Sequence, residues 1–207
     1  SDVYKRQRIH NILSHSSVAI AGLGGLGSNI AMYLARAGVG HLHLVDFDKV
    51  DITNLNRQQY DIADLGTLKT DALTKNIKRF NPFIEITSQC VKVNEDNAAE
   101  IFGGYKIVCE AFDKAENKAM LVNSILSECG DTKIVSGSGM AGFGSSNTIV
   151  TRKINDRFYL CGDTKSDMND GLALAAPRVA ICAAHEANMI LRLLIGEKAV
   201  SYTHLTL

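Results

Sequence analysis

The sequence has no surplus of either charge, no hydrophobic run long enough to cross a membrane, and no closely spaced cysteine pair. Its 22 basic residues balance 22 acidic ones, so no overall field favours nucleic acid or an anionic membrane as a partner. No apolar run approaches the roughly 18–20 residues of a membrane span, and no signal-peptide pattern is present. The 5 cysteines form no C-x-x-C pair and fit neither a disulfide scaffold nor a zinc ribbon. We therefore expect a reduced, cytoplasmic protein without structural zinc.

The two ends of the chain have a sequence that we interpret as foreign. Residues 2–7 can be encoded by a DNA sequence whose complementary strand, read after skipping 2 bases, encodes residues 200–204. The ends then derive from one inverted DNA sequence, such as a transposase adapter, translated in two frames; chance under codon degeneracy is the alternative. We expect one domain over residues 8–199, with adapter-derived tails at 1–7 and 200–207.

The remaining chain alternates between short apolar runs and amphipathic segments. Residues 17–21 read as a buried strand, a glycine-rich turn follows, and a helix runs from Ser28 to near Gly38 before a second strand at 41–45. This strand–helix–strand unit implies a right-handed parallel crossover.

The same alternation continues to the end of the domain. Helices are predicted at 69–80, 96–102, 114–129 and 177–195, strands at 83–93, 105–110 and 133–137, and antiparallel hairpins within 139–160. With 46% hydrophobic residues in a chain of 207, the pattern predicts a single α/β domain. Its expected fold is a Rossmann-like, doubly wound, mostly parallel sheet with an antiparallel extension.

The glycine-rich turn matches the G-x-G-x-x-G template at Gly22, Gly24 and Gly27, between a strand and a helix. Glycine permits a tight turn and a close backbone approach, and the helix N-terminus offers N–H groups to phosphate. Asp46 ends the next strand, where a carboxylate accepts ribose hydroxyls. NAD, FAD and ATP fit this pattern equally, and a purely structural turn is the remaining alternative. A P-loop is excluded because no lysine precedes Ser28.

The following segment favours a triphosphate. Arg57 and Lys69 supply a guanidinium fork and a point charge that a dinucleotide, already held by the glycine turn, does not need. Asp113 follows a buried strand, where an exposed carboxylate can hold Mg²⁺. An ordinary structural explanation also exists for three residues in this part of the chain: Asn54 as a turn or cap, Lys69 as a surface residue at a helix start, and Asp113 as a helix N-cap.

Residues 22–28 (GLGGLGS), 46–48 (DFD) and 54–58 (NLNRQ) resemble the adenylation domain of ThiF/MoeB proteins, bacterial relatives of ubiquitin-activating enzymes. The resemblance extends over residues 16–196 and is closest to the short ThiF-type proteins of thiamine biosynthesis. Those proteins use MgATP to adenylate the C-terminal Gly-Gly carboxylate of a ubiquitin-like sulfur carrier, ThiS, and release pyrophosphate. The resemblance therefore implies ATP and Mg²⁺ as cofactors, a ThiS-like partner and a homodimer.

The resemblance also implies roles for individual residues. It assigns nucleotide binding to Gly22, Gly24, Gly25, Gly27, Ser28, Asp46, Asp48, Asn54, Arg57 and Lys69. Arg57 and Lys69, with Asp113 as the Mg²⁺ ligand, form the implied catalytic set. A carboxylate that attacks the α-phosphate needs charge neutralisation and alignment more than acid–base chemistry, and this set supplies both.

The chain departs from the family pattern in three ways. The two C-x-x-C zinc pairs of longer relatives are absent, and the family's acidic-x-x-Asp-Asn signature reads EAFDK over residues 110–114, which keeps Asp113. An N-terminal arginine reaches the neighbouring subunit's ATP in relatives, and Arg8 is the candidate here. Cys161 is a candidate sulfur-transfer thiol, although we favour a small buried residue at the end of a strand.

Three other functions stay open at this point. The same chemistry on another carboxylate, such as one borne by a tRNA, would use the same site, as in ThiF-like tRNA dehydratases. An NAD-binding oxidoreductase would need a catalytic pair beside the glycine turn, and none is evident. A nucleotide-binding partner without catalysis would not need Arg57, Lys69 and Asp113 together.

Overall fold

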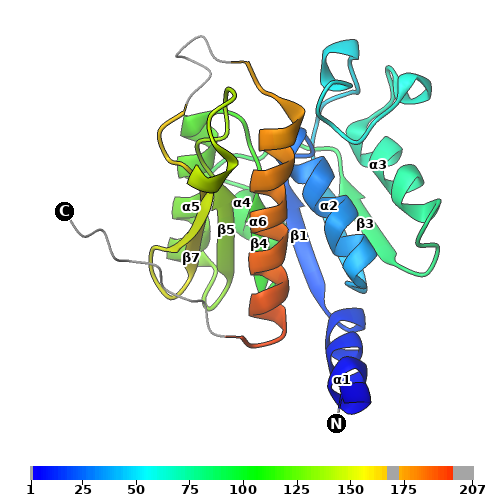
Figure 1. Ribbon diagram of the computed structural model, residues 1–207, viewed down its shortest axis with the longest axis vertical. Coiled ribbons are helices and arrows are strands. Elements are labelled where there is room, and N and C mark those ends of the chain that lie inside the picture. The colour runs from blue at the N-terminus through cyan, green and yellow to red at the C-terminus, as the bar shows by residue number, and fades with distance from the viewer. Residues whose placement is uncertain (1, 167–172, 198–207) are drawn as a thin grey trace.

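The computed structural model describes residues 2–166 and 173–197 and consists of a twisted sheet with helices on both faces (Figure 1). The 7 strands lie in the order β3-β2-β1-β4-β5-β7-β6. They are β1 (Ser17–Ala21), β2 (His41–Val45), β3 (Glu85–Gln89), β4 (Ile107–Glu110), β5 (Lys133–Gly137), β6 (Val150–Lys153) and β7 (Phe158–Gly162). All neighbouring strands are parallel except β6 and β7. The predicted doubly wound, mostly parallel fold with an antiparallel extension is therefore confirmed.

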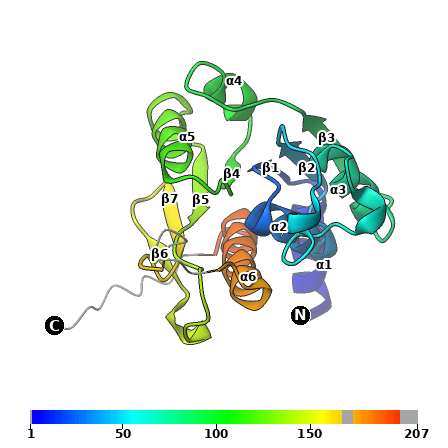
Figure 2. The ribbon, with the colours of Figure 1, turned by 90° about the horizontal axis from the view of Figure 1, so that it is seen from above.

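The helices form two layers, one on each face of the sheet (Figure 2). One layer contains α2 (Gly25–Ala37), α3 (Lys69–Lys78) and α6 (Ala176–Leu194), and the other contains α4 (Ala98–Phe102) and α5 (Ala115–Glu128). Helix α1 (Asp2–Ser14) precedes β1, and short 3₁₀ turns span Ile52–Asn54, Ile62–Asp64 and Ser146–Thr148. Among the described helices, none is long and apolar enough to cross a membrane.

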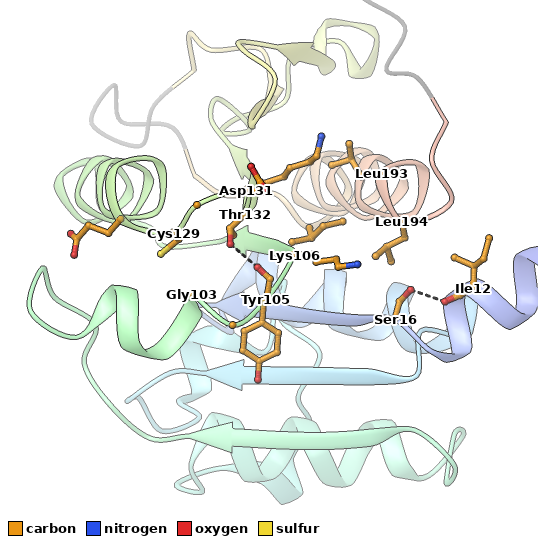
Figure 3. Close-up of a pocket in the computed structure, with 15 residues that line it drawn as sticks. Ile12, Ser16, Gly103, Tyr105, Lys106, Cys129, Asp131, Thr132, Leu193 and Leu194 are labelled. Atoms are coloured by element: carbon orange, nitrogen blue, oxygen red, sulfur yellow. Dashed lines mark hydrogen bonds between the residues drawn. The ribbon is translucent and has the colours of Figure 1, made fainter.

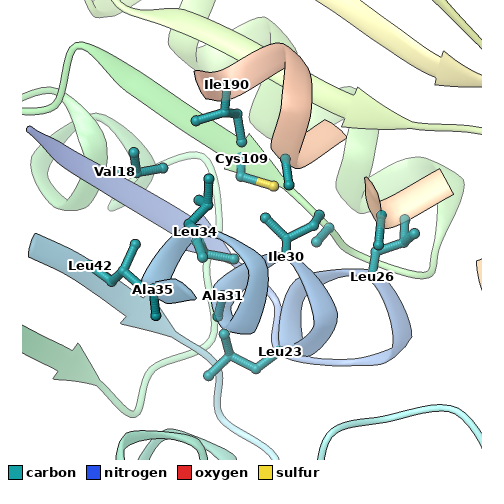
Figure 4. Packing of buried hydrophobic residues seen from close by; sticks show 14 of the residues in the cluster. Val18, Leu23, Leu26, Ile30, Ala31, Leu34, Ala35, Leu42, Cys109 and Ile190 are labelled. Carbon is teal, nitrogen blue, oxygen red and sulfur yellow. The ribbon is translucent and has the colours of Figure 1, made fainter. Parts of the chain in front are cut away.

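Alternation along the strands divides the core into two clusters. Val18 and Ile20 of β1 face α2 and α6, whereas Ala19 and Ala21 face the layer of α4 and α5. Figure 4 shows the first cluster, in which α2 packs its apolar face onto β1 and β2. The apolar residues that recur every 2 positions in the strands and every 3.6 positions in α2 therefore pack against one another at one buried surface.

Strands β1 and β4 are neighbours, but the helices that follow them cover opposite faces. This arrangement makes a topological switch point, and ligands in such sheets bind in the crevice at the carboxyl ends of the strands. That edge lies at the top of Figure 1, and Figure 2 looks onto it. The glycine turn after β1, Asp46 after β2 and Asp113 after β4 all lie along it.

Three details differ from the expectations or fall outside them. The strand predicted at 83–93 is only Glu85–Gln89, because it is an edge strand whose residues are mostly exposed. The segment predicted to form antiparallel hairpins contributes one, and its second strand, β7, joins β5 in parallel. Residues 2–7 form the exposed first half of α1, whereas residues 200–207 lie outside the described part of the chain. The boundaries of the native domain stay a prediction.

Candidate active site

Two glycines of the turn are required by close packing. Gly22 has φ +90°, and a Cβ there would lie 2.8 Å from the carbonyl oxygen of Ala111, in the segment that follows β4. A Cβ on Gly27 would lie 1.8 Å from the carbonyl oxygen of Gly22, so α2 begins as close to β1 as the backbone allows. These two positions therefore place the start of α2 against both strands of the switch point.

Gly24 and Gly25 lie at the N-terminus of α2 and are half-buried. Gly24 is the N-cap, so no side chain caps the helix. The space beside it is open, because the nearest atom to a Cβ placed on Gly24 would be 3.8 Å away. The first N–H groups of a helix have no intrahelical partner and, with the helix dipole, attract anions. This end of α2 is therefore suited to phosphate.

Asp46 fixes the glycine turn in place. Its carboxylate accepts hydrogen bonds from the backbone N–H groups of Leu23 and Asp48, both at 2.7 Å, and the Tyr60 hydroxyl donates to the Leu23 carbonyl at 2.8 Å. Burial raises the pKa of the Asp46 carboxyl, while these N–H donors and the charge of Lys69 oppose the rise. The turn is thus held at both polar atoms of Leu23, independently of any ligand.

Lys69 begins α3 and is buried, with 7% of its side chain exposed. Its ammonium lies 3.2 Å from the Asp48 carboxylate, which is 51% exposed. The ordinary explanation of Lys69 as a surface residue is therefore wrong. A buried ammonium paired with a half-exposed carboxylate has a charge available to an incoming phosphate at little desolvation cost.

Arg57 packs its aliphatic stem near Gly25, where a Cβ would be 3.7 Å from the arginine Cγ and Cδ. Its Nη1 donates to the Thr53 carbonyl at 3.0 Å and to Asn56 Oδ1 at 2.7 Å. Its Nε is buried and has no hydrogen-bond partner among the described residues. An orphaned donor is costly unless a ligand satisfies it, so the guanidinium beside the α2 N-terminus fits a phosphate oxygen.

Two other predicted residues have structural hydrogen bonds. Ser28 is fully buried, donates to the Gly24 carbonyl at 2.6 Å and accepts from the Gln59 N–H at 3.1 Å. Asn54 accepts from the Asp51 N–H at 2.9 Å in a capping box, which agrees with its ordinary explanation as a cap. These contacts fix the loop that bears Arg57 against the start of α2.

Asp113 is exposed and lies three residues beyond β4, beside the segment that contacts Gly22. It is not the N-cap of α5, because that position is Lys114. Among the described residues, no group of at least three His, Cys, Asp or Glu side chains is arranged to hold a metal. Mg²⁺ in phosphate sites commonly takes one or two carboxylates, with phosphate oxygens and water as its other ligands, so a single exposed carboxylate here fits it.

The structure adds Gln58 to the residues that the sequence singled out. Gln58 is buried, its Oε1 has no partner among the described residues, and its Nε2 lies 3.8 Å from a Cβ placed on Gly24. In the sequence, its signal was its place at the end of the 54–58 motif, where no individual role was predicted for it. Cys161 is fully buried, and burial raises the pKa of its thiol, as expected for a core residue and not for a reactive one.

A cavity of about 740 Å³ lies at the opposite edge of the sheet (Figure 3). It is lined by Ile12, Tyr105, Cys129 and Leu194, among others. The chain enters β4 and β5 there, and α5 and α6 end there. The cavity is therefore separate from the glycine turn and the residues that the sequence singled out, which lie at the carboxyl edge.

The fold and its carboxyl edge together define a Rossmann-like α/β domain in which the N-terminus of α2, with no side-chain cap, lies at the switch point. The chain belongs to the ThiF family, whose model matches residues 6–207. It is 39% identical over 129 residues to the adenylyltransferase and sulfurtransferase UBA4 of Scheffersomyces stipitis. These residues make up 62% of this chain and 29% of that protein. It is 38% identical over 114 residues to the adenylyltransferase and sulfurtransferase MOCS3 of Caenorhabditis briggsae, which covers 55% and 28%. The chain thus spans under a third of the length of these relatives.

Solved structures of similar fold come from proteins of low sequence identity. The E. coli tRNA N6-threonylcarbamoyladenosine dehydratase TcdA, in complex with AMP, has a TM-score of 0.82 at 21% identity and covers 95% of this chain and 97% of its own. E. coli MccB with ATP has a TM-score of 0.69 at 20% identity and covers 91% of this chain and 58% of its own. At these identities the likeness shows the fold alone.

Proposed function

We propose that this protein is an ATP-dependent adenylyltransferase that activates the C-terminal carboxylate of a ubiquitin-like, ThiS-like sulfur carrier. The observation that supports this most is the buried, unpartnered Nε of Arg57 beside the uncapped N-terminus of α2. The buried ammonium of Lys69, which is paired with Asp48 and interacts with Asp46, would supply a second cation at this edge of the sheet. That is more positive charge than a diphosphate held by the turn requires.

In the proposed reaction, a carboxylate oxygen of the substrate attacks the α-phosphorus of ATP and pyrophosphate leaves. Asp46 accepts from the ribose, the α2 N-terminus binds phosphate, and Arg57 and Lys69 neutralise the charge that develops on the leaving group. Asp113 would hold Mg²⁺, which when bound neutralises phosphate charge. No general base is needed, because the nucleophile is already ionised.

The sulfur carrier is favoured as substrate because the relatives UBA4 and MOCS3 are named adenylyltransferases and sulfurtransferases. A role in thiamine biosynthesis, a homodimer and a cytoplasmic location belong to the same proposal. A tRNA-borne carboxylate is the second candidate, because TcdA acts on a modified tRNA by its name and matches almost the whole chain. Both candidates share the adenylation step and differ in the molecule that supplies the carboxylate.

The test is ATP–pyrophosphate exchange with purified ThiS-like carrier, with threonylcarbamoyladenosine-modified tRNA, and with neither. We expect exchange only with the carrier, and Arg57→Ala should lower it about 10²–10³-fold, as loss of one transition-state donor typically does. Arg79→Ala, at the opposite end of α3 from Lys69, is the matched control and should exchange like wild type. Exchange with the tRNA alone would replace the carrier by the second candidate, and wild-type rates in folded Arg57→Ala would remove Arg57 from the mechanism.

A binding experiment separates adenylation from hydride chemistry. If Arg57 and Lys69 hold a triphosphate, ATP should bind more tightly than AMP in the presence of Mg²⁺, and Lys69→Ala should reduce the difference. Calorimetric titration of ATP, AMP and NAD into both proteins measures this. Preferential binding of NAD that is indifferent to Lys69→Ala would favour the oxidoreductase.

A further inference from the structure

An ion pair with one fully buried partner lies at the end of β4, three residues before Asp113 in the chain. Glu110, the last residue of β4, is fully buried, and Lys118 of α5 places its ammonium 3.3 and 3.1 Å from its two carboxylate oxygens. Ser136 of β5 donates a further hydrogen bond to the same carboxylate. Burial tends to lower the pKa of Lys118, but the pKa is raised, chiefly because of the Glu110 carboxylate that the ammonium contacts. The pair ties α5 to the sheet.

The same carboxylate also fixes the segment that leads to Asp113. Glu110 accepts a hydrogen bond from the N–H of Phe112 at 2.7 Å, and the N–H of Ala111 donates to the Ala21 carbonyl of β1 at 2.8 Å. Both residues that precede Asp113 are therefore attached to the switch point. Asp113 itself has no such bond to the sheet among the described contacts, so its place depends on its neighbours.

On the other side of Asp113, α5 begins without a side-chain cap, since Lys114 at the N-cap makes no such hydrogen bond. Lys118 lies one turn into this helix, and its contact with Glu110 connects that turn to β4. Asp113 thus lies in a short turn whose two ends are both held by one carboxylate, through Phe112 on one side and Lys118 on the other.

We propose that Glu110 and Lys118 are positioning residues, which set the Asp113 carboxylate relative to the glycine turn so that it can take Mg²⁺ together with ATP phosphates. This inference rests on the proposed function, because it concerns the metal of that site. A carboxylate ligand must be held in position to within a fraction of an ångström, and partners behind a metal ligand typically change metal affinity about 10–100-fold when removed. Neither residue needs to touch substrate for this role.

The test uses Lys118→Met, which keeps much of the side chain's volume and removes its charge. Hydrogen exchange of the ligand-free protein should become faster at the Phe112 amide. Calorimetry of ATP with and without Mg²⁺, in the absence of any carrier, should show the Mg²⁺ enhancement of ATP affinity reduced about 10-fold or more, with affinity in its absence unchanged. The exposed Lys92→Met is the matched control and should change neither quantity.

A double variant separates positioning from general stability. If Lys118 acts through Asp113, Lys118→Met should reduce the Mg²⁺ enhancement in wild type but add nothing in an Asp113→Asn background. Equal further loss in both backgrounds would overturn the proposal, as would wild-type exchange at Phe112 with wild-type Mg²⁺ dependence.

Two further results keep the test decisive. If Lys118→Met does not fold, Glu110→Gln replaces it, because the amide oxygen can still accept from Phe112 while the ion pair is lost; unchanged Mg²⁺ enhancement in this variant would overturn the proposal. A wild-type protein that binds ATP no better with Mg²⁺ would instead overturn the metal role of Asp113 in the proposed function, and the first titration shows this before any variant is made.

Discussion

At the scale of single residues, Glu186 is the least expected group in the structure. This carboxyl of α6 is fully buried, and its described donors are the thiols of Cys109 at 3.6 Å and Cys182 at 3.8 Å. Burial raises the pKa of Glu186 well above its ordinary value; the charge of Lys118 opposes this and that of Glu110 adds to it. Thiols are weak donors, so the neutral acid is the form that this pocket suits.

Because its pKa is raised in the folded chain, Glu186 makes the free energy of unfolding depend on pH. Above the ordinary carboxyl pKa, the unfolded chain releases this proton while the folded chain retains it. The free energy of unfolding therefore falls as pH rises through this range. Glu186→Gln should therefore be more stable than wild type near pH 7, and the advantage should disappear towards pH 4. Thermal unfolding measures it: about 1 kcal/mol corresponds to roughly 2–4 °C in a domain of this size. The exposed Glu100→Gln is the control, and a Glu186→Gln protein less stable at pH 7 would contradict the argument.

At the scale of elements, the start of α2 depends on Gly27. Its Cβ position lies 1.8 Å from a backbone oxygen, which cannot rotate away as a side chain can. Gly27→Ala should lower the free energy of unfolding by about 1–3 kcal/mol or more, as other overpacked sites do, and should weaken ATP binding. Urea unfolding measures the first effect and calorimetry the second. Gly104→Ala is the control, because nothing lies within 4 Å of its Cβ position; equal stability of the two variants would contradict this explanation.

Several elements were predictable because their signals are local. The turn at Gly22, the helix after it and the strand 133–137 follow from glycine spacing, apolar runs and polar punctuation. The parallel pairing of β7 with β5 is not local: it depends on where the hairpin docks, and no residue within 150–162 signals that choice. The grouping of Arg57 and Lys69 in one site came from the motif and stays a prediction. The contacts of Tyr60 and Lys118 join residues that are 37 and 8 positions apart in sequence, and no local signal announces them.

At the scale of the whole molecule, the fold buries part of the second half of α1 and leaves its first half exposed. Within α1, Leu13 is buried and Ser14 packs against Gly40, whereas residues 2–8 are exposed. We predict that removal of residues 1–7 and 200–207 changes the free energy of unfolding by no more than about 0.5 kcal/mol, the usual range for surface changes. Chemical denaturation of the full and trimmed chains measures this. Leu13→Ala should instead cost about 2–5 kcal/mol, and a comparable loss on trimming would show that the tails belong to the fold.

The double attachment of Leu23, through Asp46 and Tyr60, has a consequence for the time course of nucleotide capture. When a loop has to become ordered on binding, part of the binding free energy is lost to that ordering. The rearrangement also slows formation of the complex. Here both polar backbone atoms of the residue at the centre of the turn are already bonded to the sheet edge and the following loop. The turn therefore meets the nucleotide in its final shape. Under the proposed function, we therefore expect no slow step from a closing of the turn around ATP.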